Sequence, residues 1–202
     1  MSYSPPTASR SYALLRHLTL PVVAITTSSG GVSNGFIVNS AQRASLVPTS
    51  PRISLYVSKP NFSHRLVYES GLFTLHLLRT DQWAVIRALG LRSARDVPDK
   101  LDDLDTRTGV TGCPILDDCI ASFECRVINA MDAGGSTFFL GDVVDIREDE
   151  PGDVLTSGYF RENAPADLLA EYEAGLAKAQ QILEPISRTI TTRPWPGPVT
   201  GA

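Results

Sequence analysis

Short runs of alternating apolar and polar residues, each closed by glycine or proline, are the feature that most constrains this chain. β-Branched and aromatic residues are frequent in these runs, as is typical of half-buried strands. The clearest runs cover residues 22–27, 34–41, 53–57, 72–78, 122–128 and 137–147. Because only short helical patterns lie between them, we predict a mainly β fold, a compact antiparallel barrel of six strands with short inserted helices and a C-terminal helix.

The stretch from Ile53 to Gly71 predicts a strand that leads directly into a helix. Pro60 ends the strand, Asn61 is a favoured N-cap residue, and Gly71 marks the expected helix end. Four polar residues therefore fall at the helix start: Lys59, Ser63, His64 and Arg65. Because backbone N–H groups at a helix N-terminus attract anions, these residues predict a phosphate site. The alternative is a capped surface helix whose first turn is polar.

We expect four segments along the chain. Residues 1–20 form an N-terminal extension in which 9–20 have the pattern of a short amphipathic helix, and residues 21–164 form the barrel domain. Residues 165–190 form a C-terminal helix, because apolar residues recur there at spacings of three and four: Leu169, Tyr172, Leu176 and Leu183. The Pro- and Gly-rich residues 191–202 are expected to be a flexible tail. The polar residues 91–112 are expected to be a long surface loop.

Charge, hydropathy and cysteine usage exclude several classes of function. The 202 residues carry a formal net charge of −4 and no basic block, which argues against a nucleic-acid partner. No apolar run approaches the roughly 20 residues of a membrane span, and we find no secretory signal, so we expect no membrane association and a cytoplasmic location. Cys113, Cys119 and Cys125 contain no C-x-x-C pair. We interpret them as reduced structural thiols and predict no metal site.

Five separated segments match motifs of one known family, in the right order. A hairpin strand ending in Asn-Gly-(aromatic or Met)-x-Val-x-Ser matches residues 34–40, and a Ser-x-x-Pro segment matches 45–48. An aromatic-Thr-His-x-Leu-like turn corresponds to 62–66, and Glu-Ser-Gly-x-Phe-x-(Val or Leu)-Asn-Leu corresponds to 69–77. A strand of the form Phe-(Ile or Leu)-Gly-(Glu or Asp)-Val matches 139–143. Together, over roughly residues 21–146, these segments resemble the flavin reductase-like family, the FMN-binding split barrels.

The resemblance implies a Greek-key split β-barrel that forms a homodimer. It also implies an NAD(P)H-dependent flavin reductase that binds FMN, takes electrons from NADH or NADPH, and supplies reduced flavin to a monooxygenase or another acceptor. FAD would use the same phosphate site. By the resemblance, the flavin ring would lie against Val38, Asn39, Ser40 and Ala41. The phosphate would lie on Lys59, Ser63 and His64, with Asn34 and Arg65 as further candidates.

The sequence departs from the family pattern at two places. Many members carry Gly-Asp-His before the last hairpin strand, where the His helps to place the nicotinamide; this chain has Gly134, Gly135 and Ser136 there, so Ser136 marks the expected nicotinamide region. His76 replaces the usual Asn after Gly71, and we expect it to face a polar rim. One alternative is therefore an FMN-binding electron-transfer flavoprotein reduced by a protein partner rather than by NAD(P)H. Another is a binder of pyridoxal phosphate, haem or a deazaflavin.

Overall fold

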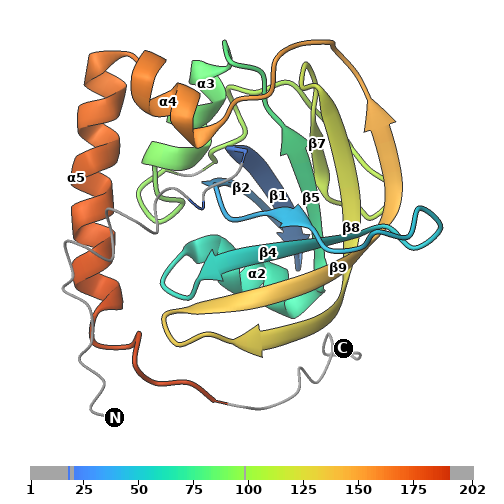
Figure 1. Ribbon diagram of the computed structural model, residues 1–202, viewed down its shortest axis with the longest axis horizontal. Helices are drawn as coiled ribbons and strands as arrows, with labels where there is room; N and C mark the ends of the chain where they lie inside the picture. The colour runs from blue at the N-terminus through green and yellow to red at the C-terminus, as the bar shows by residue number, and fades with distance from the viewer. Residues whose placement is uncertain (1–17, 19–20, 98, 192–202) are drawn as a thin grey trace.

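A computed structural model describes residues 18, 21–97 and 99–191. Within these residues an antiparallel sheet of seven strands has the order β2-β1-β5-β8-β9-β4-β3 (Figure 1). The strands are β1 (Val23–Ser29), β2 (Val32–Val38), β3 (Gln42–Arg43), β4 (Arg52–Ser58), β5 (Leu72–Leu77), β8 (Ala121–Asp132) and β9 (Ser136–Glu148). Apolar side chains of these strands form a core that includes Ile25, Leu55, Phe73 and Phe139.

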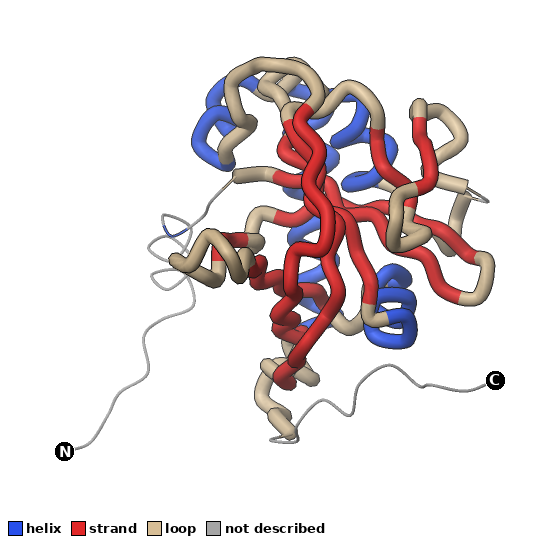
Figure 2. Tube along the Cα trace, turned by 90° about the vertical axis from the view of Figure 1, so that its right-hand side faces the viewer, coloured by secondary structure: helices blue, strands red, loops and turns tan. Residues whose placement is uncertain are grey.

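The sheet curls towards closure. β2 and β3 are its two edge strands, although only three residues, 39–41, separate them in the chain. The sheet must therefore bend round until its edges approach each other, as in an open barrel. Figure 2 shows the resulting long, strongly twisted strands. The predicted mainly β, antiparallel architecture is confirmed. The predicted count of six strands is wrong, because the two residues of β3 pair with β4 and add a seventh strand.

Turn chemistry explains the two hairpins that frame the sheet. β1 and β2 are joined by Gly30 and Gly31, which have φ values of 57° and 79°. Two consecutive positive φ values suit the tight turn between antiparallel strands, and they favour glycine. The longer β8–β9 hairpin contains register shifts between Glu124 and Cys125 and between Val127 and Asn129. Such bulges bend a hairpin, and they allow these long strands to follow the curvature of the sheet.

The helices pack around the sheet and form a second core. α2 (Phe62–Ser70) lies between β4 and β5, α3 (Trp83–Ile86) continues as the π-helical η2 (Arg87–Leu91), and α4 (Ser157–Asn163) precedes α5 (Ala166–Leu183). On α5, Leu168 is fully buried, and Leu169 and Tyr172 pack against the same cluster. Packing within the chain therefore covers part of the apolar stripe that we predicted on the C-terminal helix. None of the described helices is long and apolar enough to cross a membrane.

Several sequence predictions fall outside the described residues or need correction. The expected helix over 9–20 and most of the expected tail lie outside the described residues. The expected surface loop over 91–112 contains part of a small two-stranded sheet, β6 (Thr106–Thr108) with β7 (Pro114–Leu116). Its polar sequence hides this pairing because the two strands are only three residues long.

Buried polar side chains hold this two-stranded insertion on the barrel. His76 is completely buried; its Nε2 accepts a hydrogen bond from Leu116 N (3.0 Å), and its Nδ1 contacts the Ala24 carbonyl oxygen (3.3 Å). The expectation that His76 faces a polar rim is therefore wrong. The carboxylate of Glu124 accepts hydrogen bonds from Val110 N (3.0 Å) and Thr111 N (2.7 Å). His76 and Glu124 thus provide hydrogen-bond partners for backbone groups that the sheet does not pair.

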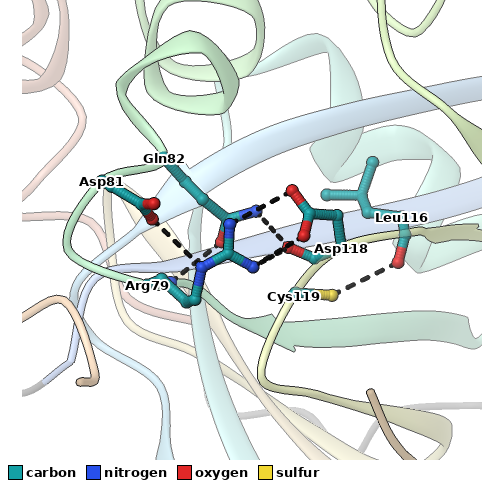
Figure 3. Close-up of polar contacts among 6 residues, drawn as sticks. All are labelled: Arg79, Asp81, Gln82, Leu116, Asp118 and Cys119. Atoms are coloured by element: carbon teal, nitrogen blue, oxygen red, sulfur yellow. Dashed lines mark hydrogen bonds and ion pairs between the residues drawn. The ribbon is translucent and has the colours of Figure 1, made fainter. Parts of the chain in front are cut away.

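An ion-pair cluster anchors the same insertion at its other end (Figure 3). Arg79 follows β5, and its guanidinium donates to both carboxylate oxygens of Asp118, at 2.8 and 3.1 Å, and to the Asp118 carbonyl oxygen at 2.7 Å. Gln82 donates to the same carbonyl oxygen. Asp118 has a φ of 64°, which is uncommon for a residue other than glycine. The bidentate contact with Arg79 thus fixes a turn of unusual backbone conformation.

Candidate functional site

The N-terminus of α2 forms the centre of the candidate site. β4 ends at Ser58, and its last pairs with β9 are Val57–Thr137 and Ser58–Ser136. The chain then turns through Lys59 and Pro60, and Asn61 is the N-cap residue, as predicted. The side chain of Asn61 forms no capping hydrogen bond. The first N–H groups of a helix have no intrahelical acceptor, so this helix start retains donors that fit a phosphate group.

Lys59 lies between α2 and the tip of the β8–β9 hairpin. Its Nζ is 2.7 Å from Oδ1 of Asp132, and its backbone N–H donates to the Gly135 carbonyl oxygen (2.9 Å). Asp132 Oδ1 also accepts a hydrogen bond from Gly134 N (2.8 Å). The Lys59 hydrogen bond is the main reason that the pKa of Asp132 falls to about 2. Asp132 is therefore ionised at neutral pH and fixes Lys59 beside the helix start.

His64 occupies the first turn of α2 and is half-buried. Its Nε2 is 2.7 Å from Thr137 Oγ1 on β9, and its ring stacks on Tyr68 with 5.9 Å between centroids. Burial lowers the pKa of His64, and the nearby charge of Lys59 lowers it further. The imidazole is therefore neutral near pH 7 and can act as a hydrogen-bond donor without adding a charge.

A cavity of about 560 Å³ opens beside the helix start. Asn34 and Ser63 are both buried in its wall, and Asn34 Nδ2 donates to Ser63 Oγ (2.7 Å). The loop after η2 and one face of α5 form the other walls. Four cationic residues line it, against the two acidic residues Asp96 and Glu171: Arg92, Arg95, Lys100 and Lys178. The cavity wall thus has an excess of positive charge, which favours an anionic ligand.

Lys100 is the most buried of these cations. Its Nζ donates to the carbonyl oxygens of Gly35 (2.8 Å) and Leu89 (2.6 Å), and burial lowers its pKa to about 8. These contacts tie β2 to η2 across the cavity wall. Arg95 reaches the helix start from the same side, because its Nη2 donates to the Pro60 carbonyl oxygen (2.8 Å).

The four residues predicted to face a flavin ring lie between the two edge strands of the sheet. Val38, Asn39 and Ser40 are half-buried, and Ser40 Oγ donates to the Tyr56 carbonyl oxygen (3.2 Å). Ala41 is buried and lines a second, largely apolar cavity of about 540 Å³, which also contains residues of β3, β5 and β9. The predicted ring residues therefore do not line the cavity that contains Asn34 and Ser63.

The remaining predicted residues divide into two groups. Ser136 is buried and pairs with Ser58, so it lies directly beside Lys59. Arg65 is exposed, points along its own helix to Glu69 (3.4 Å) and stacks over Phe62, so it does not join the cluster at the helix start. The structure thus brings together Lys59, Ser63, His64, Asn34 and Ser136, and leaves Arg65 on the surface.

Sequence reasoning missed three residues of this site. Asp132 and Thr137 contact Lys59 and His64, yet each lies 73 residues further along the chain. Lys100 lies in a stretch that we interpreted as a surface loop. The pairing of β4 with β9 brings the first two to the helix start, and a single sequence does not show that register. The turn residues Asp132 to Ser136 were the only available signal.

The chain is similar to a known protein family and to several of its individual members. A family model described as flavin reductase like domain matches residues 15–165. The ferric-chelate reductase (NAD(P)H) of Archaeoglobus fulgidus is 30% identical over 134 residues, which cover 65% of this chain and 78% of the relative. The FMN reductase (NADH) SmoA of Agrobacterium fabrum is 35% identical over 123 residues, or 61% of this chain and 66% of the relative. The match thus spans slightly less than two thirds of that relative.

A solved structure shows the same architecture. The nitrilotriacetate monooxygenase component B from Mycobacterium thermoresistibile superposes with a TM-score of 0.61 at 25% sequence identity. The superposition covers 79% of this chain and 93% of that one. Since the family model covers well over half of the chain, including the curled sheet and the start of α2, this protein belongs to the flavin reductase-like family.

Proposed function

We propose that this protein is an NAD(P)H-dependent flavin reductase that binds FMN at the start of α2 and supplies reduced flavin to a monooxygenase or another acceptor. The observation that carries the proposal is the uncapped helix start beside Lys59 and a cation-lined cavity. Family membership and the activities named for the two relatives support the reaction class. The name of the structural neighbour supports a monooxygenase as the acceptor.

Each residue at the helix start has a distinct role in this proposal. The N–H groups of Phe62 and Ser63 bind the phosphate, and Lys59 neutralises part of its charge. Asn34 holds Ser63 in place through the 2.7 Å hydrogen bond. Val38, Asn39 and Ser40, which are half-buried, and the buried Ala41 line the ring. FAD shares the phosphate and the ring with FMN, so the same residues would bind it.

The chain does not need to supply a strong acid or base. Bound flavin provides the hydride chemistry, and the protein contributes binding and orientation. His64 is neutral, held by Thr137, and donates or accepts one hydrogen bond at the site. Ser136, next to Lys59, marks the side from which NADH or NADPH approaches.

We further propose that the protein is a homodimer. The second cavity is bordered by side chains that are exposed in the single chain, including Leu46 (84% exposed), Val47 (55%) and Ile146 (55%). Exposed apolar side chains around an apolar hollow are typical of a protein–protein interface. A second copy of the chain would cover them and would also bring its surface close to Ala41.

A cytoplasmic location remains part of the proposal. All three cysteines are free and buried, as is common in proteins that fold under reducing conditions. A supply of NADH or NADPH in the same compartment is what the proposed reaction requires.

A second candidate is the FMN-binding electron-transfer flavoprotein that a protein partner reduces. One observation favours it: the residues after α5 contact the hairpin tip next to Ser136, on the side where a nicotinamide would approach. This candidate keeps the flavin site and changes only the electron donor.

Absorption spectroscopy separates the candidates. The purified protein is titrated with FMN, and the complex is then mixed anaerobically with NADH and with NADPH. Binding followed by bleaching with either nucleotide is expected for the reductase. Binding without bleaching by either would overturn the reductase and favour the electron-transfer protein. Failure to bind FMN or FAD would overturn both and leave other ligands of this fold.

A pair of variants tests the site itself. Lys59→Met removes a charge-assisted contact, so the Kd for FMN should rise about 10- to 100-fold. Arg126→Met removes the same charge from an exposed position on β8 and should leave the Kd unchanged. Equal effects of the two substitutions would show that only net charge matters and would contradict the assigned site.

A further inference from the structure

The tip of the β8–β9 hairpin is covered by the residues that follow α5. We call the last residue of α5 and the residues that follow it, Leu183–Thr191, the strap; Figure 1 shows the chain after α5 running past this hairpin. A Cβ atom added at Gly134 would overlap the Ser187 carbonyl oxygen, and one at Gly135 would lie 3.0 Å from Leu183 Cδ2. The strap therefore approaches the hairpin backbone closely at Gly134, which matches the family's glycine, and at Gly135, which replaces its Asp.

The carboxylate of Asp132 fastens the strap to the site. Asp132 Oδ2 accepts a hydrogen bond from Thr191 N (2.9 Å), at the far end of the strap. The other oxygen, Oδ1, holds Lys59 Nζ (2.7 Å) and Gly134 N (2.8 Å). A lysine ammonium has three N–H donors, so Lys59 can contact Asp132 and a phosphate at the same time. Asp132 thus joins the strap, the hairpin tip and the lysine at the start of α2.

The strap has few other anchors. Its other hydrogen bonds within the described residues are local turns, such as Ser187 N to the Leu183 carbonyl oxygen (2.9 Å), and most of its residues are exposed. Segments with few buried contacts open at low free-energy cost. Loss of the Thr191–Asp132 bond is therefore enough to free its end.

We propose that the strap controls access to the flavin site beside the hairpin tip, and that Asp132 is a positioning residue which both fastens the strap and orients Lys59. The proposal rests on the proposed function for the identity of the ligands. A donor that approaches over Ser136 meets the strap, so the strap must lift before the donor can reach the flavin. In this chain Gly134 and Gly135 make room for the strap at the positions where the family pattern has Gly-Asp, and Ser136 stands in place of the His.

The sharpest test removes one hydrogen-bond donor. Thr191→Pro has no backbone N–H to give to Asp132, whereas Thr191→Ala keeps that N–H and loses only the exposed side chain. In the full-length protein without flavin, amide hydrogen exchange over residues 184–190 should be about tenfold faster in Thr191→Pro than in the wild type. Thr191→Ala should match the wild type. Equal exchange in all three proteins would overturn the fastening role of Asp132.

The same proteins, loaded with FMN, test access. Single-turnover mixing with NADH and NADPH should give a larger second-order rate constant of flavin reduction in Thr191→Pro than in Thr191→Ala. An unchanged or smaller rate constant with faster strap exchange would overturn the access role. If the protein binds no flavin, the proposed function fails, whereas the exchange measurement still decides whether the strap is fastened.

The proline in Thr191→Pro could also change the backbone conformation of the preceding residue, Ile190. A second pair of variants controls for this effect. Gly134→Ala places a methyl group against Ser187, at a φ of 78°. Gly112→Ala imposes the same backbone strain at a φ of 82°, with no atom within 4 Å of the new methyl group. Strap exchange should rise in Gly134→Ala and stay at the wild-type rate in Gly112→Ala. A rise in both or in neither would overturn the contact that the proposal depends on.

Discussion

Two histidines on the same barrel differ in burial and in how their surroundings can receive a ligand. His76 is sealed in the interior, where Leu116 N and the Ala24 carbonyl oxygen occupy both ring nitrogens. His64 is half-buried at a helix start whose N-cap side chain forms no capping bond, next to a cavity with cationic walls. The difference teaches that a buried polar residue marks a site only when neighbouring donors remain available to a ligand.

The largest effect is expected at Glu124, which is buried on the His76 side. Glu124→Ala removes the acceptor for Val110 N, Thr111 N and Thr111 Oγ1. The lost bonds and the space left behind should lower the free energy of unfolding by about 4 kcal/mol, with no change in the Kd for FMN. Urea denaturation and flavin titration measure both. Glu124→Gln keeps one acceptor oxygen and should cost less; a loss of flavin affinity in the folded variant would break the contrast.

The next effect is a pH dependence of stability caused by His76. Burial lowers its pKa from 6.5 to about 4 in the folded protein. Between these pH values the unfolded chain binds more protons, so stability is complete above pH 6.5 and is lost as the pH falls towards 4. The loss should total about 3 kcal/mol. Urea denaturation between pH 7 and pH 4 measures it.

His76→Asn provides the control for this pH effect. Asparagine can still donate and accept hydrogen bonds, and it does not titrate. The charged groups that influence the pKa of His76 are Glu124, Asp149 and Arg107. All three are unchanged in the variant. The difference between the two pH profiles therefore isolates His76. Parallel profiles would show that His76 contributes nothing to the pH dependence.

The sequence predicted the local features of the fold and missed those set by distant pairing. Alternating residues, Asn61 and Gly71 were sufficient to predict β4, α2 and their boundary, since these signals act within a few residues. The two-residue β3 was missed because so short a strand has no periodicity. The location of His76 was mispredicted because its partners, Ala24 and Leu116, lie 52 and 40 residues away.

The candidate site shows the same division. Lys59, Ser63 and His64 were predicted from the helix start, whereas their partners come from other elements: Asp132, Asn34 and Thr137. Arg65 was included because it follows His64 in the sequence, yet a helix turns consecutive side chains by about 100°, so neighbours face different directions. The cationic side of the cavity depends on how η2 and α5 pack, which no local pattern encodes.

A smaller effect is expected from His64, on ligand affinity rather than on stability. His64→Ala removes one polar contact beside the phosphate site, so the Kd for FMN should rise about tenfold. The half-buried ring also packs on Tyr68, so a stability loss of about 1 kcal/mol is expected. Flavin titration and thermal unfolding measure the two. His64→Gln can still contact Thr137 and should recover part of the affinity; a variant that binds flavin like the wild type would place His64 outside the site.

The smallest effect is expected at Arg79, which lies on the His76 side and is partly accessible. Arg79→Lys keeps the charge and loses the two-pronged contact with Asp118, whose backbone has a φ of 64°. Because lysine cannot donate in parallel to both oxygens, stability should fall by about 1 kcal/mol. Asp81→Ala removes only an exposed partner of Arg79 and should stay within about 0.5 kcal/mol of the wild type. Neither substitution should alter the Kd for FMN. An effect on flavin binding here would mean that the insertion communicates with the start of α2, and the two regions would then form one functional unit.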